Sequence, residues 1–353
     1  VESIESIANG YGNLLNDISL DDSSQVFSRI FLTDIENQAD ILRDVKLMNQ
    51  MKKGCFSILQ QPSGYDVKAQ FFSYLVSGGD YSRSQNISRD SMENHLALKG
   101  KDNEFVWSAN MTGGTGSPRE QTENIFNSYV SQMGGEKEMN LRNLVRTWVY
   151  VRDIDNNYQG MVDARREFFH ENGLTSKTGY PASTGIEGQA LGPAHLVSLD
   201  ALTVNGLREG QASELNSYEN LSSTDLYGVT FSRGMKLGFS DRSHYYISGT
   251  ASIGSEGQIL HLRDIKKQTK RTLGNINALL QSGSGGLKDL KYLIVYLRDH
   301  TDLHVVEKII ADTLGENLPV IFLKAPVCRP GWLVEIEGVA GNTKGREDLP
   351  PFL

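Results

Sequence analysis

The sequence predicts an α+β fold made of two tandem copies of one unit, in which a mixed sheet carries two helices on one face. Two observations support this prediction. The same series of helical and strand patterns occurs twice along the chain, and each helical pattern has a single apolar face, which needs a sheet to cover it. Two such units also suit the length of 353 residues, which is long for one hydrophobic core.

Each copy follows the order helix, strand, helix, strand, strand. The first helix of each copy places a Gln-Thr pair near its start and is followed by glycine, which favours a helix end. A β-rich run with an Arg-Asp pair near its end comes next, and an alternating strand closes the copy. The two copies align at three pairs of segments: 119–135 with 266–283, 143–155 with 289–302, and 196–204 with 333–340.

Further strands are predicted before the first helix of each copy, at 55–62 and 69–78 in the first copy and at 226–235 and 244–253 in the second. The Ser/Asn/Gly-rich segment 77–91 and residues 110–118 have the composition of loops. A polar stretch separates the copies, so we predict domains at 1–215 and 216–340. Residues 341–353 lack periodicity and are expected to form a poorly ordered tail.

The composition narrows the class of function. A net charge of −8 argues against nucleic acid as the main partner, because phosphate binding needs a basic surface. Two distant cysteines and unpaired histidines give no disulfide framework and no metal-ligand spacing, so we expect no metal. No apolar run is long enough to span a membrane, and the N-terminal residues do not resemble a signal peptide. The expectation is a soluble cytoplasmic protein with no membrane partner.

The closing strand of the second copy holds two carboxylates, Glu335 and Glu337, on one face. In the first copy Asp200 stands at the position of Glu337, whereas Ser198 replaces Glu335. An acidic residue that recurs in both copies, as at Glu337, is typical of a structural role. Glu335, which does not recur, is therefore the candidate catalytic residue. Glu335 is then either a carboxylate on a solvated sheet face or a partly buried acid with a raised pKa that donates a proton.

Several basic residues stand in apolar surroundings. Arg146 shares one face of a strand with Trp148 and Tyr150, and an arginine so placed needs an anion from the protein or from a ligand. Arg233 and Lys324 are weaker cases of the same kind. For each of them a surface charge or an internal ion pair is the alternative.

Small residues in the segment 247–257, among them Gly249 and Ala251, form a tight turn or make room for a ligand. The segment lacks the Gly-Lys end of a phosphate-binding loop. Cys328 lies seven residues before Glu335. It is a small apolar filler, a residue that contacts the substrate, or a nucleophile that a histidine distant in sequence activates.

These residues carry a family resemblance. The segments "ISGTASIGSEGQ", "IKKQTKRTLGNINALL", "LKDLKYLIVYLRD" and "LVEIEGVA", within residues 245–340, resemble the Rid/YjgF domain. The resemblance implies a chorismate-mutase-like fold, a tendency to form trimers and ligand sites between subunits. Members that hydrolyse imines carry an arginine in a "PAR" motif. The corresponding segments here read "LPVI" (318–321) and "YPAS" (180–183), which disfavours imine deamination.

A narrower resemblance covers nearly the whole chain. The segments "SRIFLTD", "CFSILQQP", "VRTWVYV", "YPASTGIEG", "FSRGM", "ISGTASI" and "CRPGWLVEIEG", in this order, resemble the chorismatases, two-domain relatives of the Rid family that hydrolyse chorismate. One departure is "QQPSGYD" at 60–66, where a "QQPPLDG"-like segment is expected. The resemblance implies that Glu335 is the catalytic acid. A cysteine at position 328 is associated with members that form a hydroxybenzoate.

The hypothesis is therefore an enzyme that hydrolyses the enolpyruvyl ether of chorismate by Glu general-acid catalysis. The products would be pyruvate and a hydroxybenzoate or a dihydroxycyclohexadiene carboxylate. Arg146, with Arg233 and Lys324, would bind the two substrate carboxylates, and Tyr150 would wall the ring. The small anionic substrate is the expected partner, and no cofactor is required. The alternatives are a Rid-type enamine or imine deaminase and a non-catalytic binding protein. The oligomeric state, a homo-oligomer included, stays open.

Overall fold

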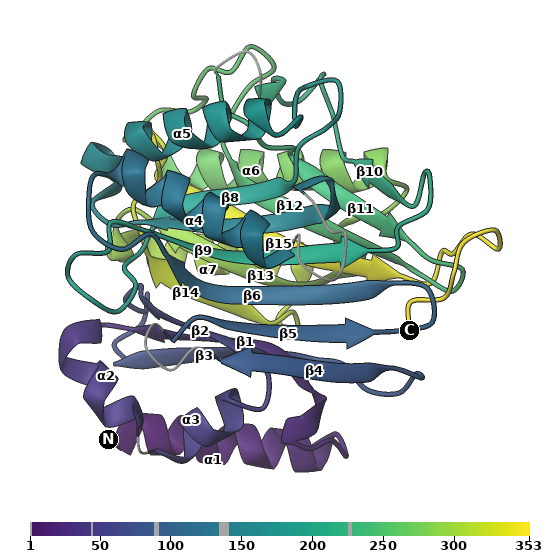
Figure 1. Ribbon diagram of the computed structural model, residues 1–353. Helices are drawn as coiled ribbons and strands as arrows, with labels where there is room; N and C mark the ends of the chain where they lie inside the picture. Colours follow the sequence, from purple (N-terminus) through teal and green to yellow (C-terminus); the bar gives the residue numbers. More distant parts are fainter. Residues whose placement is uncertain (1, 44, 88–91, 134–140, 225–227) are drawn as a thin grey trace.

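A computed structural model of the chain describes residues 2–43, 45–87, 92–133, 141–224 and 228–353 (Figure 1). It confirms the α+β class, with three sheets that carry helices on their outer sides. We name three parts after these sheets: the first lobe (2–76), the second lobe (82–205) and the third lobe (212–342). Across the described ranges, every helix is too short or too polar to cross a bilayer.

The second lobe is a six-stranded sheet in the order β4-β5-β6-β9-β7-β8, with α4 and α5 packed side by side on one face. Alternating apolar residues give the strands this buried face, and the helices bring their own apolar stripes to it. The elements are β4 (Ser82–Ile87), β5 (Asn94–Lys99), β6 (Glu104–Thr112), α4 (Pro118–Met133), β7 (Leu144–Val151), α5 (Ile154–Glu171), β8 (Ala182–Glu187) and β9 (Val197–Asn205).

The third lobe repeats this arrangement with the order β10-β11-β12-β15-β13-β14 and the helices α6 and α7. Of the strand predicted at 226–235, residues 226 and 227 lie outside the described part of the chain. In the described remainder the strand begins only at Gly234, because the backbone of Ser232 bonds to Pro181 of the second lobe instead of joining its own sheet. The elements are β10 (Ala212–Glu214), β11 (Gly234–Gly238), β12 (Ser243–Ala251), α6 (Ile265–Ser282), β13 (Leu290–Leu297), α7 (Leu303–Leu314), β14 (Val320–Lys324) and β15 (Val334–Asn342).

The internal duplication is confirmed, and the repeated Gln-Thr pair explains part of it. Gln121 accepts a hydrogen bond from the backbone N–H of Leu196, and Gln268 accepts one from that of Leu333. Each glutamine therefore ties the first turn of its helix to the start of the closing strand. Because this bond satisfies buried backbone groups, the side chain cannot vary freely in either copy.

The first lobe is a separate unit that the sequence did not reveal. Its sheet has the order β2-β1-β3, with β1 parallel to β2 and antiparallel to β3, as β7 is to β8 and β9. The predicted strands at 55–62 and 69–78 belong to this sheet and not to that of the second lobe. The elements are α1 (Glu2–Asp17), β1 (Gln25–Leu32), α2 (Ile35–Arg43), α3 (Lys46–Met51), β2 (Cys55–Gln60) and β3 (Ala69–Leu75).

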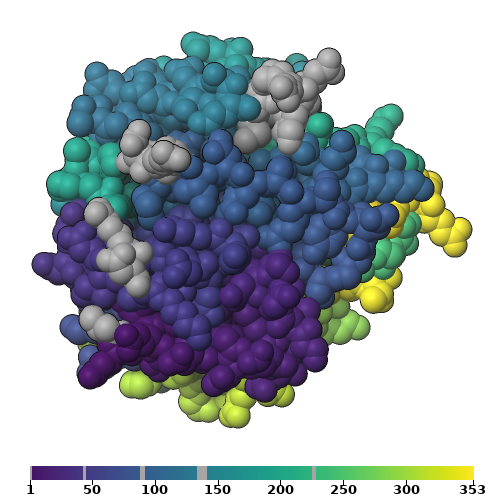
Figure 2. Space-filling view, turned by 60° about the horizontal axis from the view of Figure 1, so that its bottom comes forward, coloured from purple at the N-terminus to yellow at the C-terminus, as the bar shows by residue number. Residues whose placement is uncertain are grey.

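The three lobes meet around a shared core, with Phe27, Trp148 and Tyr296 from successive lobes in one buried cluster. Figure 2 shows the first lobe in purple packed directly against the blue surface of the second. Each pair of lobes is also joined through its backbone, so that three seams run between them. The bridges are Gln60–Gln189 between the first and second lobes, Ser63–Leu323 between the first and third, and Ala182–Ser232 between the second and third.

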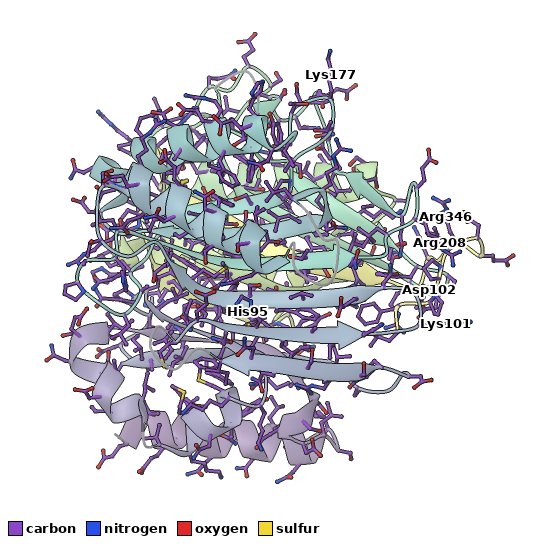
Figure 3. The ribbon with its side chains drawn as sticks, in the orientation of Figure 1. His95, Lys101, Asp102, Lys177, Arg208 and Arg346 are labelled. Atoms are coloured by element: carbon purple, nitrogen blue, oxygen red, sulfur yellow. The ribbon has the colours of Figure 1, made fainter. Side chains whose placement is uncertain are left out.

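Two segments expected to be irregular are ordered. Residues 82–87 form β4, an edge strand, whereas residues 88–91 lie outside the described part of the chain. The tail 341–353 continues past β15 and buries Leu349 and Phe352. Arg346 of the tail lies near Arg208 and Asp102 (Figure 3). The expectation of a poorly ordered tail was wrong, because its few apolar residues follow no period and yet two of them, Leu349 and Phe352, are buried.

Candidate active site

A cavity of about 230 Å³ lies on the seam between the second and third lobes. Helix α5 and strand β8 form the wall on one side. Strands β12 and β15 and the segment 328–332 form the other. The residues used below that line it are Tyr158, Arg165, Arg166, Ser183, Arg233, Gly249, Ala251, Cys328 and Glu335.

Glu335 lies on β15, where it pairs with Tyr296 of the neighbouring strand, and its side chain is 5% exposed. Burial, followed by the negative charge of nearby Glu337, raises the pKa of the Glu335 carboxyl group to about 8. The basic groups of Arg233 and Arg146 act in the opposite direction. The residue is thus a buried acid that holds its proton at neutral pH and not a carboxylate on a solvated face.

The same sheet position is occupied differently in each lobe. Ser198 stands there in the second lobe and Gln70 in the first, so only the third lobe supplies a carboxylic acid. Across the described strands, the corresponding register pairs are Tyr296–Glu335, Tyr150–Ser198 and Phe31–Gln70.

Glu337 is the centre of a buried polar network that spans the lobes. Its Oε2 atom lies 2.7 Å from the Nη2 atom of Arg146, and Trp148 donates its indole N–H to Oε1 at 2.9 Å. The hydroxyl of Thr184 also donates to Oε2, and Arg29 of the first lobe lies 3.9 Å from Oε1. Glu337 therefore meets side chains from both other lobes, and the position that recurs has a structural role.

The network removes Arg146 from the cavity wall. The guanidinium group is 2% exposed and is committed to Glu337, Thr184 and the backbone carbonyl of Thr147. The sequence had offered two alternatives for Arg146, an internal ion pair and a ligand. The structure shows the ion pair.

Arg165 is the basic residue that sequence reasoning missed. It lies on α5, lines the cavity and is 2% exposed. One nitrogen donates to the hydroxyl of Ser183 at 3.2 Å, and the buried Nε has no hydrogen-bond partner in the described structure. Burial lowers the pKa of the guanidinium group, and the ionisable side chains that oppose this shift are Tyr158 and Cys328. An arginine so placed is suited to an anionic ligand.

The signal for Arg165 was present but weak. Residues 164–166 read Ala-Arg-Arg, in which one arginine faces solvent and the other faces the sheet. Two adjacent arginines on a helix usually indicate a solvated face, so the pattern alone gives no reason to select Arg165.

The other candidates divide into two groups. Arg233, Cys328, Gly249 and Ala251 line the cavity beside Glu335. Burial raises the pKa of the Cys328 thiol to about 12, so the group is a neutral wall and not a thiolate nucleophile.

Lys324 and Tyr150 lie outside the lining. Lys324 is exposed at the end of β14, and the phenol of Tyr150 is buried and donates to Asp200 at 3.3 Å. Among the described residues, no group of three or more His, Cys, Asp or Glu side chains is placed to hold a metal ion.

Comparisons with known proteins agree with this architecture. The family model described as Endoribonuclease L-PSP matches residues 230–341, which lie within the third lobe. A 3-hydroxybenzoate synthase from Streptomyces hygroscopicus is 25% identical over 258 residues, or 67% of this chain and 74% of that protein. A chorismatase from the same organism is 26% identical over 274 residues, or 72% of this chain and 77% of that protein.

The fold is shared with a solved structure. A crystal structure of a chorismatase superposes with a TM-score of 0.69 and 19% sequence identity, over 90% of this chain and 93% of that one. This match covers all three lobes and is not restricted to the segment that the family model recognises. Together these matches show that the chain is similar to chorismatases over most of its length and to Rid-related proteins in its third lobe.

Proposed function

We propose that this protein is a chorismatase-type enzyme that hydrolyses the enolpyruvyl ether of chorismate and releases pyruvate. One observation carries the proposal. A buried glutamic acid that is protonated at neutral pH and a buried arginine that pairs with no carboxylate among the described residues line the same cavity. Chorismate offers an enol ether to the acid and a carboxylate to the arginine. The relatives named for this chemistry supply the substrate class.

Glu335 acts as the general acid in this proposal. Its proton passes to the terminal methylene carbon of the enol ether, which leaves a positive charge on the ether carbon. The glutamate carboxylate that results stabilises this cation until water adds to it. The hemiketal then divides into pyruvate and a ring alcohol, and the proton lost by water returns to Glu335. A carboxyl group with a pKa near 8 is in the required neutral form before the reaction.

Substrate carboxylates are bound by the basic residues that line the cavity. Arg165 takes one carboxylate, because its guanidinium group is already desolvated and the hydroxyl of Ser183 lies beside it. Arg233, on the wall formed by the third lobe, orients the other. This assignment replaces the one suggested by sequence, since Arg146 is held by Glu337 and Lys324 lies outside the lining.

The ring product is proposed from Cys328. The neutral thiol occupies the cavity wall near Tyr158, and the resemblance associates a cysteine here with hydroxybenzoate formation. The ring alcohol left by hydrolysis is a dihydroxycyclohexadiene carboxylate. It becomes a hydroxybenzoate when the ring loses one hydroxyl group and one hydrogen as water. Chromatography of the reaction mixture distinguishes a hydroxybenzoate from a dihydroxycyclohexadiene carboxylate.

The test is pyruvate release from chorismate, measured with a coupled lactate dehydrogenase assay. Glu335→Gln keeps the size of the side chain and removes the proton donor, so turnover is expected to be lost while the urea unfolding transition remains. Glu187→Gln is the matched control, because Glu187 is also a partly buried β-strand carboxyl group with a raised pKa but does not line the cavity. It should retain turnover.

The outcomes separate the alternatives. Turnover that survives Glu335→Gln would exclude this acid. Ammonia release from 2-iminobutyrate without pyruvate release from chorismate would indicate a Rid-type deaminase. If the protein shows neither activity, a non-catalytic binding protein remains as the explanation.

A further inference from the structure

Thr184 of β8 makes a contact that joins the two walls of the cavity. Its hydroxyl donates to Oε2 of Glu337 and accepts a hydrogen bond from Nη2 of Arg146 at 2.6 Å. It also accepts from the backbone N–H of Gly249 at 2.9 Å. One hydroxyl has one proton and two lone pairs, so every bonding position of Thr184 is used. The side chain is 1% exposed, and water cannot easily replace these bonds.

Gly249 is the surface on which the Glu335 carboxyl group rests. A Cβ atom added at Gly249 would overlap Oε1 of Glu335, so the acid lies directly against this stretch of backbone. Strand β12 has a bulge between Ile247 and Thr250, and such a bulge leaves backbone groups without a partner in the sheet. A group that accepts a hydrogen bond from the N–H of Gly249 therefore fixes the backbone against which the Glu335 carboxyl group lies.

The second lobe has a bulge at the same position, and a side chain of its own sheet satisfies the backbone N–H there. Strand β6 is irregular between Ser108 and Met111, and the N–H of Asn110 donates to Asp200 of its own sheet at 3.1 Å. In the third lobe the corresponding N–H is bound by Thr184 from across the seam. The part of the third lobe that holds the acid thus depends on a side chain from the second lobe.

We propose that Thr184 is a positioning residue that links the Arg146–Glu337 ion pair to the backbone of Gly249 and so holds the Glu335 carboxyl group for proton transfer. This inference rests on the proposed function for its catalytic consequence. The positioning itself is a statement about Glu335 and is testable without substrate.

Loss of the hydroxyl has two effects that act in the same direction. The N–H of Gly249 loses its acceptor, and a carboxyl oxygen of Glu335 lies beside Gly249. An N–H that turns to this oxygen stabilises the ionised form of the acid. A loosened bulge also admits water to Glu335 and reduces the desolvation that keeps the acid protonated. Both effects lower the pKa of the acid and move it out of position.

The experiment compares Thr184→Val, which keeps the shape and removes the hydroxyl, with Thr184→Ser, which keeps the hydroxyl. Carbon-13 NMR titration follows the Glu335 carboxyl signal, identified by its absence from Glu335→Gln. In Thr184→Val the pKa should fall by about one unit and kcat for chorismate on the order of 10-fold, with a smaller change in KM. Thr184→Ser should restore both values toward those of the wild type.

Thr203→Val is the matched control, because Thr203 is a buried threonine of the same sheet whose hydroxyl bonds to Tyr129 away from the cavity. It should alter stability without moving the Glu335 titration. If Thr184→Val does not fold, Thr184→Ala removes the same hydroxyl without adding a methyl group. An unchanged titration and kcat in the folded variant would overturn the proposal. Wild-type protein that releases no pyruvate would overturn the proposed function alone, because the titration still tests the positioning.

Discussion

The guanidinium group of Arg146 and the carboxylate of Glu337 form an ion pair of 2.7 Å across the seam between the second and third lobes. Both side chains are 2% exposed. Their partners Trp148 and Thr184 satisfy the remaining carboxylate positions. The pair therefore holds the two lobes in register beside the cavity, and its own charges are unavailable to a ligand.

Arg146→Met is expected to lower the free energy of unfolding by about 3–5 kcal/mol, because it leaves Glu337 buried with much of its charge uncompensated. Urea unfolding followed by circular dichroism measures the loss. The double variant Arg146→Met with Glu337→Gln should recover a large part of it, since no buried charge is left unpaired. If Arg146→Met instead raised KM for chorismate and left stability intact, Arg146 would be a ligand-binding residue.

Arg165→Met should show the opposite pattern. Removing a buried charge that has no carboxylate partner in the described part of the chain costs little stability and can increase it. The loss of a charge-assisted hydrogen bond to substrate should raise KM for chorismate by about 10-fold or more. Arg166→Met is the comparison, because Arg166 lines the same cavity but is 44% exposed and already paired with Asp163 at 2.7 Å. A larger effect from Arg166 than from Arg165 would contradict the assignment.

Glu335, Arg146 and Arg165 show which residues of the site could be predicted from the sequence and which could not. Glu335 could be selected because the repeat provides an internal comparison, in which Ser198 replaces it and Asp200 matches Glu337. Arg146 stood out because it interrupts an apolar strand, and that signal identifies burial but not the partner. Arg165 belongs to a helix, where burial is decided by the direction of one side chain against a sheet from another part of the chain.

The fold was predicted as far as the repeats remained similar. The Gln-Thr pairs and Arg-Asp runs fix local bonds that both later lobes need, so they persist in both copies. The first lobe keeps the strand order but not these signals: only Asp34 after β1 matches Asp153 and Asp299 after β7 and β13. Its parallel pairing of β1 with β2 depends on a crossover through α2 and α3, and pattern alone does not show which sheet a strand will join.

The turnover rate should depend on pH through Glu335. The acid must be protonated to act, so kcat/KM is expected to be level below pH 8 and to fall about 10-fold per unit above it. Binding of a dianionic substrate raises the pKa further, and the fall in kcat itself should appear at a higher pH than that in kcat/KM. Initial rates between pH 6 and pH 10 test this. A rate that rises through pH 8 would indicate a general base.

The free energy of unfolding should also depend on pH through Glu335. The Glu335 carboxyl group has a pKa of about 8 when folded against its ordinary value of 4.5, so the folded state binds this proton more tightly than the unfolded state. Its contribution is complete below pH 4.5 and is lost as pH rises toward 8, by at most about 1.4 kcal/mol per pH unit. The difference in urea stability between wild type and Glu335→Gln, measured across this range, cancels the other titrating groups. A pH-independent difference would contradict the burial of a protonated acid.

The tail is expected to stabilise the folded protein through the buried side chain of Phe352. Its ring packs at 5.1 Å on Phe105 of the second lobe and at 5.2 Å on Phe239 of the third, so the end of the chain joins the two lobes away from the cavity. Phe352→Ala should lower the free energy of unfolding by about 3 kcal/mol, whereas Tyr218→Ala, at a residue 61% exposed, should change it by about 0.5 kcal/mol or less.

The pKa of His244 provides a second measure of how the tail packs at Phe352. Its ring lies 4.6 Å from that of Phe352, and burial lowers the pKa of its imidazole to about 4. Phe352→Ala admits water to the imidazole, so this pKa should rise toward its ordinary value of 6.5, which proton NMR of the ring can follow. A variant that keeps both the stability and the low pKa would mean that the tail does not cover this end of the seam. A shift in the pKa without a loss of stability would show that the tail covers His244 but does not hold the lobes together.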